Sequence, residues 1–470
     1  MPASTSSKNS PASKRKSAPA ARSVAGPILA AVVLAALSAA AIAFFYSKGC
    51  LLYYGDATAH INVARRILDS RTPGWEQVGT VWLPLPHLLM VPFVGFDNLW
   101  MTGLAGSIPS GFCFVLAGVL IFLSARRVFA DGTAAATACL LLALNPNLLY
   151  LQAIPMTEAV FMASVAALLY ATVRFRETQS WGALTAAGLA ALAASMTRYE
   201  GWFLIPFVTL YFLMAAKERR LKHALVFGLI ASTGPLYWFA HNYFFFDDAL
   251  AFYSGPSSAK GIYQRALDAN MGRYPGDHDW RMAWFYVREA IQLCAGLPLF
   301  FLSLAGGLVA LVRRAWWPLA LLALAPLFYV WSMHSGGTPI FMPQLWPHSY
   351  YNTRYGIAAL PLLAFAAAAL VTLVPPRFRK FAAVWWFSPP SPRGWPIPAW
   401  RTGSAGRNRR SIPKRGGPGR ARAPTTCARI TAAGKASSLP SATRPPSISR
   451  PESRYARPTA NAMAAPGRRS

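Results

Sequence analysis

Long apolar segments separated by short polar ones make up most of the first 380 residues of this chain. A helix needs about 20 predominantly apolar residues to cross the ~30 Å hydrocarbon core of a bilayer. Segments near this length recur, so the pattern predicts an all-α integral membrane protein with about ten transmembrane helices. We place them near residues 26–45, 99–123, 133–151, 159–173, 181–196, 202–216, 224–239, 290–312, 316–331 and 357–374.

Two apolar segments allow a second interpretation. Segment 26–45 is long for the apolar core of a signal peptide, so we interpret it as a membrane anchor. Cleavage at the small residues 39–41 is the alternative. Segment 81–96 contains Pro84, Pro86 and Pro92, which interrupt helices, so we predict an interfacial or re-entrant piece there.

Charged residues are scarce, at 13% of the chain against about a quarter in a soluble protein. The formal net charge of +30 at first suggests nucleic-acid binding, but the excess is unevenly distributed. Residues 381–470 hold 17 Lys and Arg with a single acid, and residues 1–25 hold five with none. Because most of the basic excess lies in the tails, we expect membrane lipids rather than nucleic acid as partners.

Composition divides the chain into three parts. Residues 1–25 are expected to be a disordered basic tail in the cytoplasm, and 26–380 one polytopic membrane domain. Residues 381–470 are rich in Arg, Pro and Ser, without periodicity, so we expect disorder there too. The abrupt change after Lys380 favours an out-of-frame translation in place of the authentic C-terminus. A genuine basic tail attracted to anionic lipid is the alternative.

Basic and acidic residues alternate between successive gaps in the apolar pattern. Since cytoplasmic loops carry an excess of Lys and Arg, the alternation predicts a cytoplasmic N-terminus and an acidic outer face. The basic gaps contain Arg126-Arg127, Arg174 and Arg176, residues 217–222, Arg313-Arg314 and residues 377–380. The opposite gaps contain Asp56, Asp69, Glu76, Glu158, Glu200, Asp247, Asp248, Asp277 and Asp279.

Three segments on the predicted outer face are longer than a connection requires, at 47–98, 241–289 and 332–356. Long ordered loops usually carry function. The first contains an amphipathic pattern over 58–70, which predicts a helix lying along the membrane surface. Cys50 and Cys294 both fall near this face, and the sequence leaves open whether they form a disulfide.

Two carboxylates on the outer face are candidate catalytic groups. Asp56 follows the first predicted span by about ten residues and could act as a general base, or could simply cap the helix that runs through His60. Glu158 lies in a tight turn between two spans, where an acid is costly unless paired or used. Its alternative role is to open the next helix, whose dipole favours an acid.

Basic residues on the same face are candidate ligands for an anion. Arg198 lies two residues before Glu200, and the two could merely pair with each other. Arg354 and Tyr355 stand at the start of a late span, and Lys260 lies in the second long loop. Because guanidinium groups bind phosphate with two hydrogen bonds, such residues suit a phosphate or pyrophosphate.

These motifs, in this order, resemble those of the integral-membrane GT-C glycosyltransferases. They are most similar to bacterial family 39 enzymes related to protein O-mannosyltransferases and to lipid A aminoarabinose transferase. The resemblance covers about residues 26–380. It rests on Gly55-Asp56 with the helix that follows, the turn from Asn145-Pro146 to Glu158, the turn Thr197-Arg198-Tyr199-Glu200-Gly201, and the stretch from Asn352-Thr353-Arg354-Tyr355 to Pro361.

The sequence departs from the family in three places. Many relatives have Pro at the position of Tyr199, and the eukaryotic mannosyltransferases carry an Asp-Glu doublet in the first loop, which is absent here. The C-terminal spans or periplasmic domain of many relatives have no counterpart in this sequence.

The resemblance implies an inverting glycosyltransferase of the cytoplasmic membrane. A polyprenyl-phosphate sugar would be the donor, and a protein, lipid or glycan on the outer, periplasmic face would be the acceptor. Asp56 would be the base and Glu158 a supporting carboxylate. His60, Arg198, Glu200, Lys260, Arg354 and Tyr355 would bind substrate, with Arg198 and Arg354 as candidates for the donor phosphate.

The sequence does not decide whether a metal ion is used or whether the protein is an enzyme or a transporter. The family is divided on metal use, and a divalent ion would be shared by Asp56 and Glu158. The sequence has no nucleotide-binding glycine motif, so a nucleotide sugar is not the expected donor. The alternative function is a transporter or flippase for lipid-linked sugars.

Overall fold

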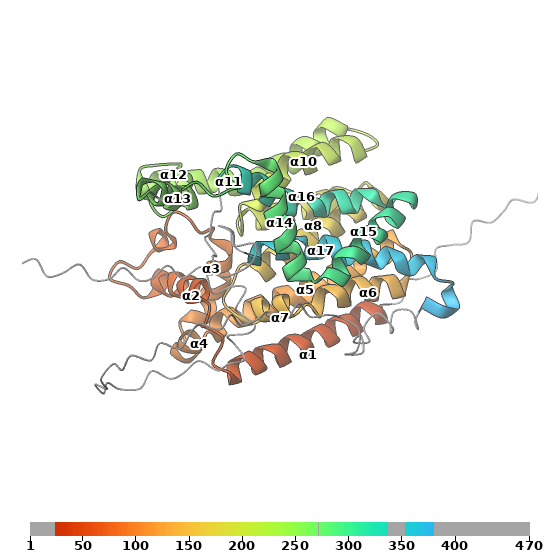
Figure 1. Cartoon of the computed structure of the whole chain (residues 1–470), viewed down its shortest axis with the longest axis horizontal. Helices are drawn as coiled ribbons and strands as arrows, with labels where there is room; N and C mark the ends of the chain where they lie inside the picture. The colour runs from red at the N-terminus through yellow and green to blue at the C-terminus, as the bar shows by residue number, and fades with distance from the viewer. Residues whose placement is uncertain (1–23, 271, 337–352, 380–470) are drawn as a thin grey trace, which may run out of the picture. The chain divides into compact units, whose positions relative to one another are not determined.

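The structure, a computed structural model, describes residues 24–270, 272–336 and 353–379 (Figure 1). Every element within these ranges is a helix. The predictions made for the tail 381–470 and for nearly all of 1–25 lie outside the described residues, as does most of the third long loop, 337–352.

Within the described residues, six stretches are long and apolar enough to cross a membrane. The sixth, 354–373, joins most of η2 (Thr353–Ala359), α17 (Leu360–Ala368) and η3 (Ala369–Leu373). The other five are α1 (Ala25–Ser47), α5 (Leu104–Val128), α8 (Glu158–Thr178), α11 (Arg220–Phe246) and α16 (Trp316–His334). The prediction of a helical membrane protein is therefore confirmed.

Two further spans are broken. Helices α6 (Gly132–Ala143) and α7 (Pro146–Ala153) meet at 64°, and α14 (Trp280–Ala295) and α15 (Leu297–Val312) meet at 109°. Pro146 starts α7 after Asn145, and Gly296 has a φ of 83° at the second break, a conformation that glycine adopts easily. Two segments predicted as continuous spans are thus helix–break–helix units.

The predicted number of about ten spans exceeds what the described residues contain, which is six, or eight if each bent pair counts as one. The difference lies in α9 (Trp181–Ser195) and α10 (Glu200–Ala215), which have 15 and 16 residues. At 1.5 Å per residue such helices reach only about 22–24 Å, less than the hydrocarbon core. Helix α9 ends and α10 begins at the charged turn that contains Arg198.

The short helices of the first long loop lie together at one end of the bundle (Figure 1). The predicted surface helix is present as α2 (Gly55–Leu68), with His60, Ile61 and Ala64 on its buried side. Its N-cap residue is Tyr54, so the suggestion that Asp56 caps this helix is wrong, although Asp56 does lie in the first turn. The other short elements are η1 (Trp75–Val78), α3 (Leu85–Val94), α4 (Asp97–Thr102), α12 (Ala251–Ser254), α13 (Ala259–Asp268) and η4 (Pro376–Phe378).

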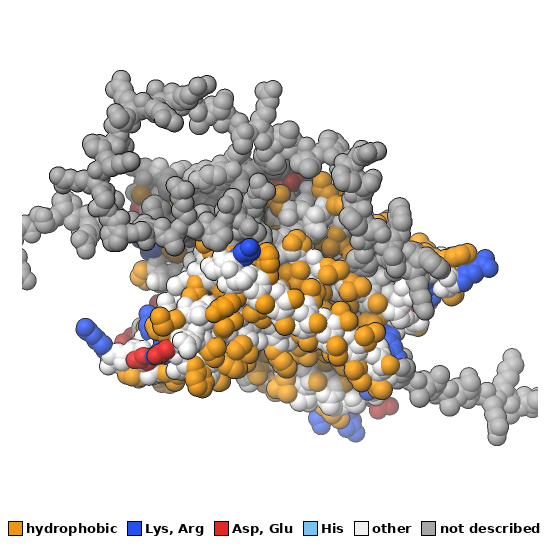
Figure 2. All heavy atoms as spheres, turned by 90° about the horizontal axis from the view of Figure 1, so that it is seen from below, with side chains coloured by type: hydrophobic (Ala, Val, Ile, Leu, Met, Phe, Trp, Pro, Cys, Tyr) orange, Lys and Arg blue, Asp and Glu red, His pale blue; other side chains and the backbone are white. Residues whose placement is uncertain are grey.

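Helix α8 is central and α1 peripheral. The most apolar window of α8 is 83% buried, against 22% for that of α1. On the face shown in Figure 2, hydrophobic side chains gather over the middle, and charged ones lie toward the ends. Exposed apolar residues of α1 include Ile28, Leu29 and Val32. An apolar belt of this kind matches a hydrocarbon environment.

The predicted basic gaps contact one another at one end of the bundle. Arg127 at the end of α5 pairs with Glu177 at the end of α8, and Arg379 pairs with Asp131 before α6. The candidate acids instead meet at another place, described below. Cys294 is not a disulfide cysteine in the structure, so the disulfide with Cys50 that the sequence left open does not form.

Candidate functional site

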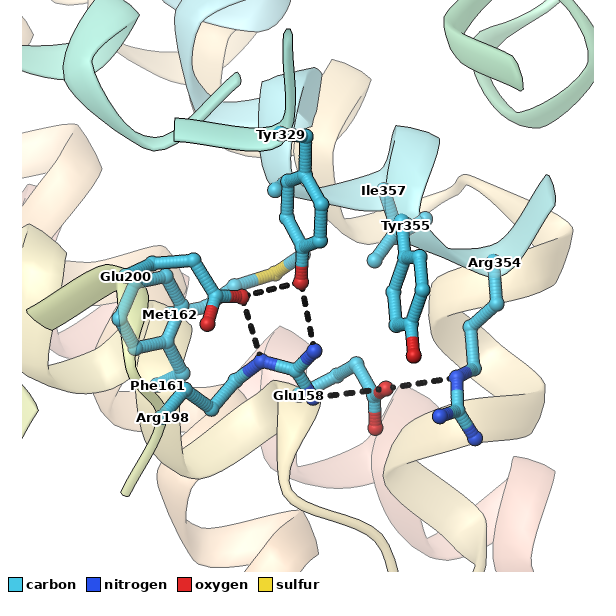
Figure 3. A pocket seen from close by; sticks show the side chains of 10 residues that line it. Glu158, Phe161, Met162, Arg198, Glu200, Tyr329, Arg354, Tyr355 and Ile357 are labelled. Carbon is cyan, nitrogen blue, oxygen red and sulfur yellow. Dashed lines mark hydrogen bonds and ion pairs between the residues drawn. The ribbon is translucent and has the colours of Figure 1, made fainter. Parts of the chain in front are cut away.

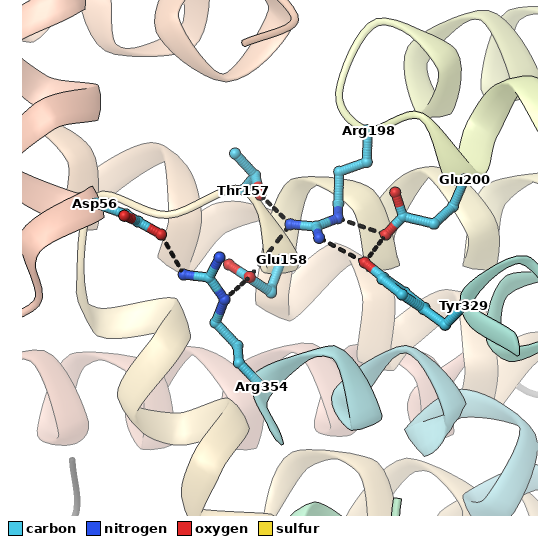
Figure 4. Close-up of polar contacts among 7 residues, drawn as sticks. All are labelled: Asp56, Thr157, Glu158, Arg198, Glu200, Tyr329 and Arg354. Carbon is cyan, nitrogen blue, oxygen red and sulfur yellow. Dashed lines mark hydrogen bonds and ion pairs between the residues drawn. The ribbon is translucent and has the colours of Figure 1, made fainter. Parts of the chain in front are cut away.

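Five charged residues predicted from the sequence converge in a single chain of ion pairs (Figure 4). They come from separate parts of the fold: the first turn of α2, the start of α8, the turn before α10, the start of α10, and η2. Carboxylates and guanidinium groups alternate along this ion-pair chain in the order Glu200, Arg198, Glu158, Arg354 and Asp56.

Arg198 is the most heavily engaged member. Its Nε donates to Glu200 Oε1 at 2.7 Å, and its Nη1 donates to Thr157 Oγ1 at 2.6 Å and to Glu158 Oε1 at 3.2 Å. Its Nη2 donates to the hydroxyl of Tyr329 at 2.6 Å, and that hydroxyl in turn donates to Glu200. Burial alone would lower the pKa of Arg198, but neighbouring Glu200 and Glu158 contribute to a pKa well above the usual value. The guanidinium is therefore a fixed positive charge.

Arg354 lies between the two candidate catalytic carboxylates. Its Nη1 donates to Asp56 Oδ2 at 2.8 Å, and its Nε lies 3.2 Å from Glu158 Oε1. The side chain of Asp56 is 29% exposed, whereas that of Glu158 is 3% exposed. Asp56 is thus the solvent-facing end of the ion-pair chain.

Glu158 has an unused oxygen beside a small pocket (Figure 3). Both arginines approach Oε1, while Oε2 is buried and has no hydrogen-bond partner among the described residues. Burying such an acceptor unpaired costs roughly 1–3 kcal/mol or more, so its position favours a bound group that donates a hydrogen bond. The pocket is lined by Glu158, Phe161, Met162, Arg198, Glu200, Tyr329, Arg354, Tyr355, Ile357 and Ala358.

Two tyrosines form one wall of this pocket. The rings of Tyr329 and Tyr355 stack with centroids 4.7 Å apart and an interplanar angle of 18° (Figure 3). The guanidinium groups of Arg198 and Arg354 lie 5.9 Å and 5.6 Å from the ring centroid of Tyr355. Aromatic faces attract cations, so this ring helps to hold both arginines.

Two glycines explain why these turns fold as they do. A Cβ at Gly201 would lie 2.3 Å from the carbonyl carbon of Ala194, so only glycine allows the tight turn that presents Arg198. A Cβ at Gly356 would lie 2.2 Å from the carbonyl oxygen of Ala290 in α14. Because Gly356 has no side chain, η2, with Arg354 and Tyr355, can pack directly on the backbone of α14.

The Asn145-Pro146 motif links the two helix breaks. Asn145 Oδ1 accepts a hydrogen bond from Leu148 N and caps α7. Its Nδ2 donates to the carbonyl of Cys294 at 2.8 Å, and Asn147 Nδ2 donates to the same carbonyl at 3.0 Å. This motif therefore supports the helices around the site and does not enter the ion-pair chain.

A metal ion does not fit the carboxylates as they are arranged. Arg354 stands between Asp56 and Glu158, and no group of three or more His, Cys, Asp or Glu able to hold a metal occurs in the described ranges.

His60 lies beside the chain of ion pairs but outside it. Its Nδ1 is 2.9 Å from Nε2 of His87, and its ring lies 4.3 Å from that of Trp82. Burial is the main cause that lowers the pKa of both histidines, to about 4 for His87. Both rings are neutral at pH 7, so one donates to the other. Substrate binding by His60 stays a prediction.

Lys260 lies elsewhere. It is exposed on α13, and its ammonium group sits 4.5 Å from the ring centroid of Tyr253. No contact joins it to the ion-pair chain within the ranges that the structure describes, so its role in substrate binding also stays a prediction.

Sequence reasoning missed Tyr329, which contacts Arg198 and Glu200 from α16. Its signal was a single hydroxyl within the apolar segment 316–331, where a buried phenol usually finds a hydrogen-bond partner. Thr157 was also missed as a partner of Arg198.

Comparison with solved structures shows which known fold the chain resembles. The chain is similar in fold to ArnT from Cupriavidus metallidurans, a crystal structure bound to undecaprenyl phosphate, with a TM-score of 0.51 and 15% sequence identity. The match covers 77% of this chain and 63% of that one, so this chain spans less than two thirds of the length of that relative. The fold is thus that of a polytopic ArnT-like membrane protein.

A second comparison relates part of the chain to a known protein family. The model of the dolichyl-phosphate-mannose-protein mannosyltransferase family matches residues 100–241. This segment includes Glu158, Arg198 and Glu200 and makes up less than half of the chain, so this part of the chain is similar to that family. The resemblance predicted from the sequence is confirmed. None of the curated proteins matches the chain.

Proposed function

We propose that this chain is an inverting glycosyltransferase. It takes a sugar from a polyprenyl-phosphate donor and transfers it to an acceptor at the outer face of the cytoplasmic membrane. The observation that carries the proposal is the convergence of Asp56, Glu158 and Arg354, with an unsatisfied carboxylate oxygen beside a pocket. The match of residues 100–241 to the mannosyltransferase family model and the ArnT-like fold support the donor class.

The proposed reaction needs one base and one cationic group. Asp56 takes the proton from an acceptor hydroxyl, whose oxygen forms a bond to the anomeric carbon. The bond between that carbon and the phosphate oxygen breaks on the opposite side, and its electron pair leaves with the phosphate. Arg354 stabilises the charge that develops on the phosphate, and the free oxygen of Glu158 accepts a hydrogen bond from a sugar hydroxyl.

A transporter of lipid-linked sugars is the second candidate, and the two broken spans favour it. Transporters use discontinuous helices near the membrane midplane to bind substrates. Here, however, the breaks are held to each other by the Asn145 and Asn147 amides, and neither break contains a charged residue. The ionisable groups gather instead in turns and at the starts of helices, which suits chemistry at an interface.

The test is sugar transfer by the purified full-length chain from defined polyprenyl-phosphate sugars, comparing wild type with Asp56→Asn. We expect the substitution to abolish measurable turnover. Asp69→Asn is the matched control, because Asp69 is an exposed acid of the same loop paired with Arg65. Unchanged turnover in Asp56→Asn would remove Asp56 from the mechanism. Movement of intact lipid-linked sugar across vesicles without transfer would favour the transporter.

The predicted sidedness can be tested separately. A cysteine introduced as Asp69→Cys should react with a membrane-impermeant maleimide added to intact spheroplasts. Labelling only after lysis would place this end of the bundle in the cytoplasm.

A further inference from the structure

The two arginines of the ion-pair chain are not equivalent. Each of the three side-chain nitrogens of Arg198 donates to a buried partner, and two of those partners are the buried acids Glu158 and Glu200. Arg354 also contacts buried Glu158 through Nε, but its Nη1 donates to Asp56, which is the most exposed carboxylate of the ion-pair chain (Figure 4). A phosphate could replace Asp56 at Arg354 without opening the buried part of the network.

The charge balance makes such a replacement necessary for phosphate binding. Among the described residues, the ion-pair chain has three carboxylates and two guanidinium groups, so it already carries one excess negative charge. Adding a phosphate next to an unmoved Asp56 would place like charges side by side, which costs several kcal/mol. Glu158 and Glu200 are fixed by buried hydrogen bonds, whereas Asp56 can rotate toward solvent.

We propose that the donor phosphate binds Arg354 by displacing Asp56, and that this exchange frees Asp56 to act as the base. Arg198 is then a positioning residue that holds Glu158 and does not touch the phosphate. This inference rests on the proposed function and deepens it, because it assigns the phosphate subsite and links donor binding to activation of the base.

The exchange has a consequence for the order of events. While Arg354 Nη1 donates to Oδ2 of Asp56, this carboxylate oxygen is held against the guanidinium and is not available to an acceptor hydroxyl. Without donor, Asp56 stays in that pair. Binding of the donor phosphate breaks the pair at the moment when a base is needed, so the donor binds before the acceptor is deprotonated.

Binding of undecaprenyl phosphate to the full-length chain in lipid nanodiscs tests the exchange without any sugar transfer. Asp56→Asn should bind this lipid at least about tenfold more tightly than wild type, because the competing negative charge is gone. Arg354→Gln should weaken binding by about tenfold or more, since the phosphate loses its cation. Asp69→Asn is the control: it removes an exposed carboxylate at the end of α2 and should leave the affinity for undecaprenyl phosphate unchanged.

Three results would overturn the inference or its basis. Unchanged or weaker binding by Asp56→Asn, in a sample whose melting temperature matches wild type, shows that Asp56 does not compete with phosphate. A loss of affinity in Arg198→Lys as large as in Arg354→Lys shows that the arginines share the phosphate. Failure of wild type to bind undecaprenyl phosphate at all removes the donor class itself, and therefore the proposed function as well.

Discussion

Removal of the guanidinium of Arg198 should destabilise the protein more than any other single change to a charged side chain in the site. Arg198 hydrogen-bonds to Glu200, Glu158, Thr157 and Tyr329 at 2.6–3.2 Å. Both acids are 3% exposed, so Arg198→Gln leaves two buried carboxylates with less compensation. Removing one partner of a buried ion pair costs about 3–5 kcal/mol. That is a large share of the roughly 5–15 kcal/mol that stabilises a typical protein.

The assay is thermal unfolding of the purified chain in detergent, followed by near-UV circular dichroism. We expect a fall in melting temperature on the order of 10 °C for Arg198→Gln. Arg174→Gln serves as the control, because Arg174 pairs with Glu177 at 3.6 Å and its side chain is 39% exposed. An exposed pair of that kind contributes about 0–1 kcal/mol.

A double substitution tests the cause of the loss. If uncompensated negative charge is responsible, adding Glu200→Gln to Arg198→Gln should restore at least about 1 kcal/mol of stability. The reasoning is refuted if Arg198→Gln melts within 2 °C of wild type, or if the two substitutions destabilise additively.

Three further changes have defined outcomes. Tyr329→Phe keeps the ring that stacks on Tyr355 but removes a hydroxyl bonded to two charged groups, so it should cost about 1.5–3 kcal/mol in the same melting assay. A wild-type melting curve would show that the hydroxyl is dispensable. Gly356→Ala should lower the free energy of unfolding by about 1–3 kcal/mol, because its Cβ would lie 2.2 Å from a backbone oxygen of α14. It should also reduce undecaprenyl phosphate binding, because Arg354 would be displaced. Intact binding would mean that η2 can shift without moving the site. Burial lowers the pKa of His87 from 6.5 to about 4, so the unfolded state binds a proton more readily than the folded state. The free energy of unfolding should therefore be highest above pH 6.5 and should fall as the pH drops toward 4. His87→Gln should flatten this dependence, and an equally steep curve would assign it to other groups.

The individual residues of the site were predictable because each is chemically out of place in its local sequence. Glu158 and Arg198 interrupt apolar segments, and an ionisable group at such a point is costly unless it has a partner or a function. Asp56 stands alone after the first apolar segment. By contrast, the hydroxyl of Tyr329 indicates that this residue has a hydrogen-bond partner, but its apolar, aromatic-rich segment does not show which residues those partners are.

The number of spans was harder to predict, because hydropathy shows how apolar a segment is and does not show where the helix bends or ends. Segment 290–312 is apolar throughout, yet the positive φ at Gly296 turns the chain by 109° between α14 and α15. Segments 181–196 and 202–216 are apolar enough for spans, but the turn that presents Arg198 leaves helices of 15 and 16 residues.

The sequence by itself determined the class of protein, the apolar belt and the identity of the charged residues, because these follow from composition and from the period of the apolar pattern. Tertiary structure alone decided which charges meet. Asp56 and Arg354 are 298 residues apart, and their contact depends on η2 packing against α14. It also decided that Arg354 contacts both Asp56 and Glu158, and that the acids around Arg198 are buried while Asp56 is partly exposed. Ion pairs act over a few ångströms, so only the packing of helices distant in sequence can set them.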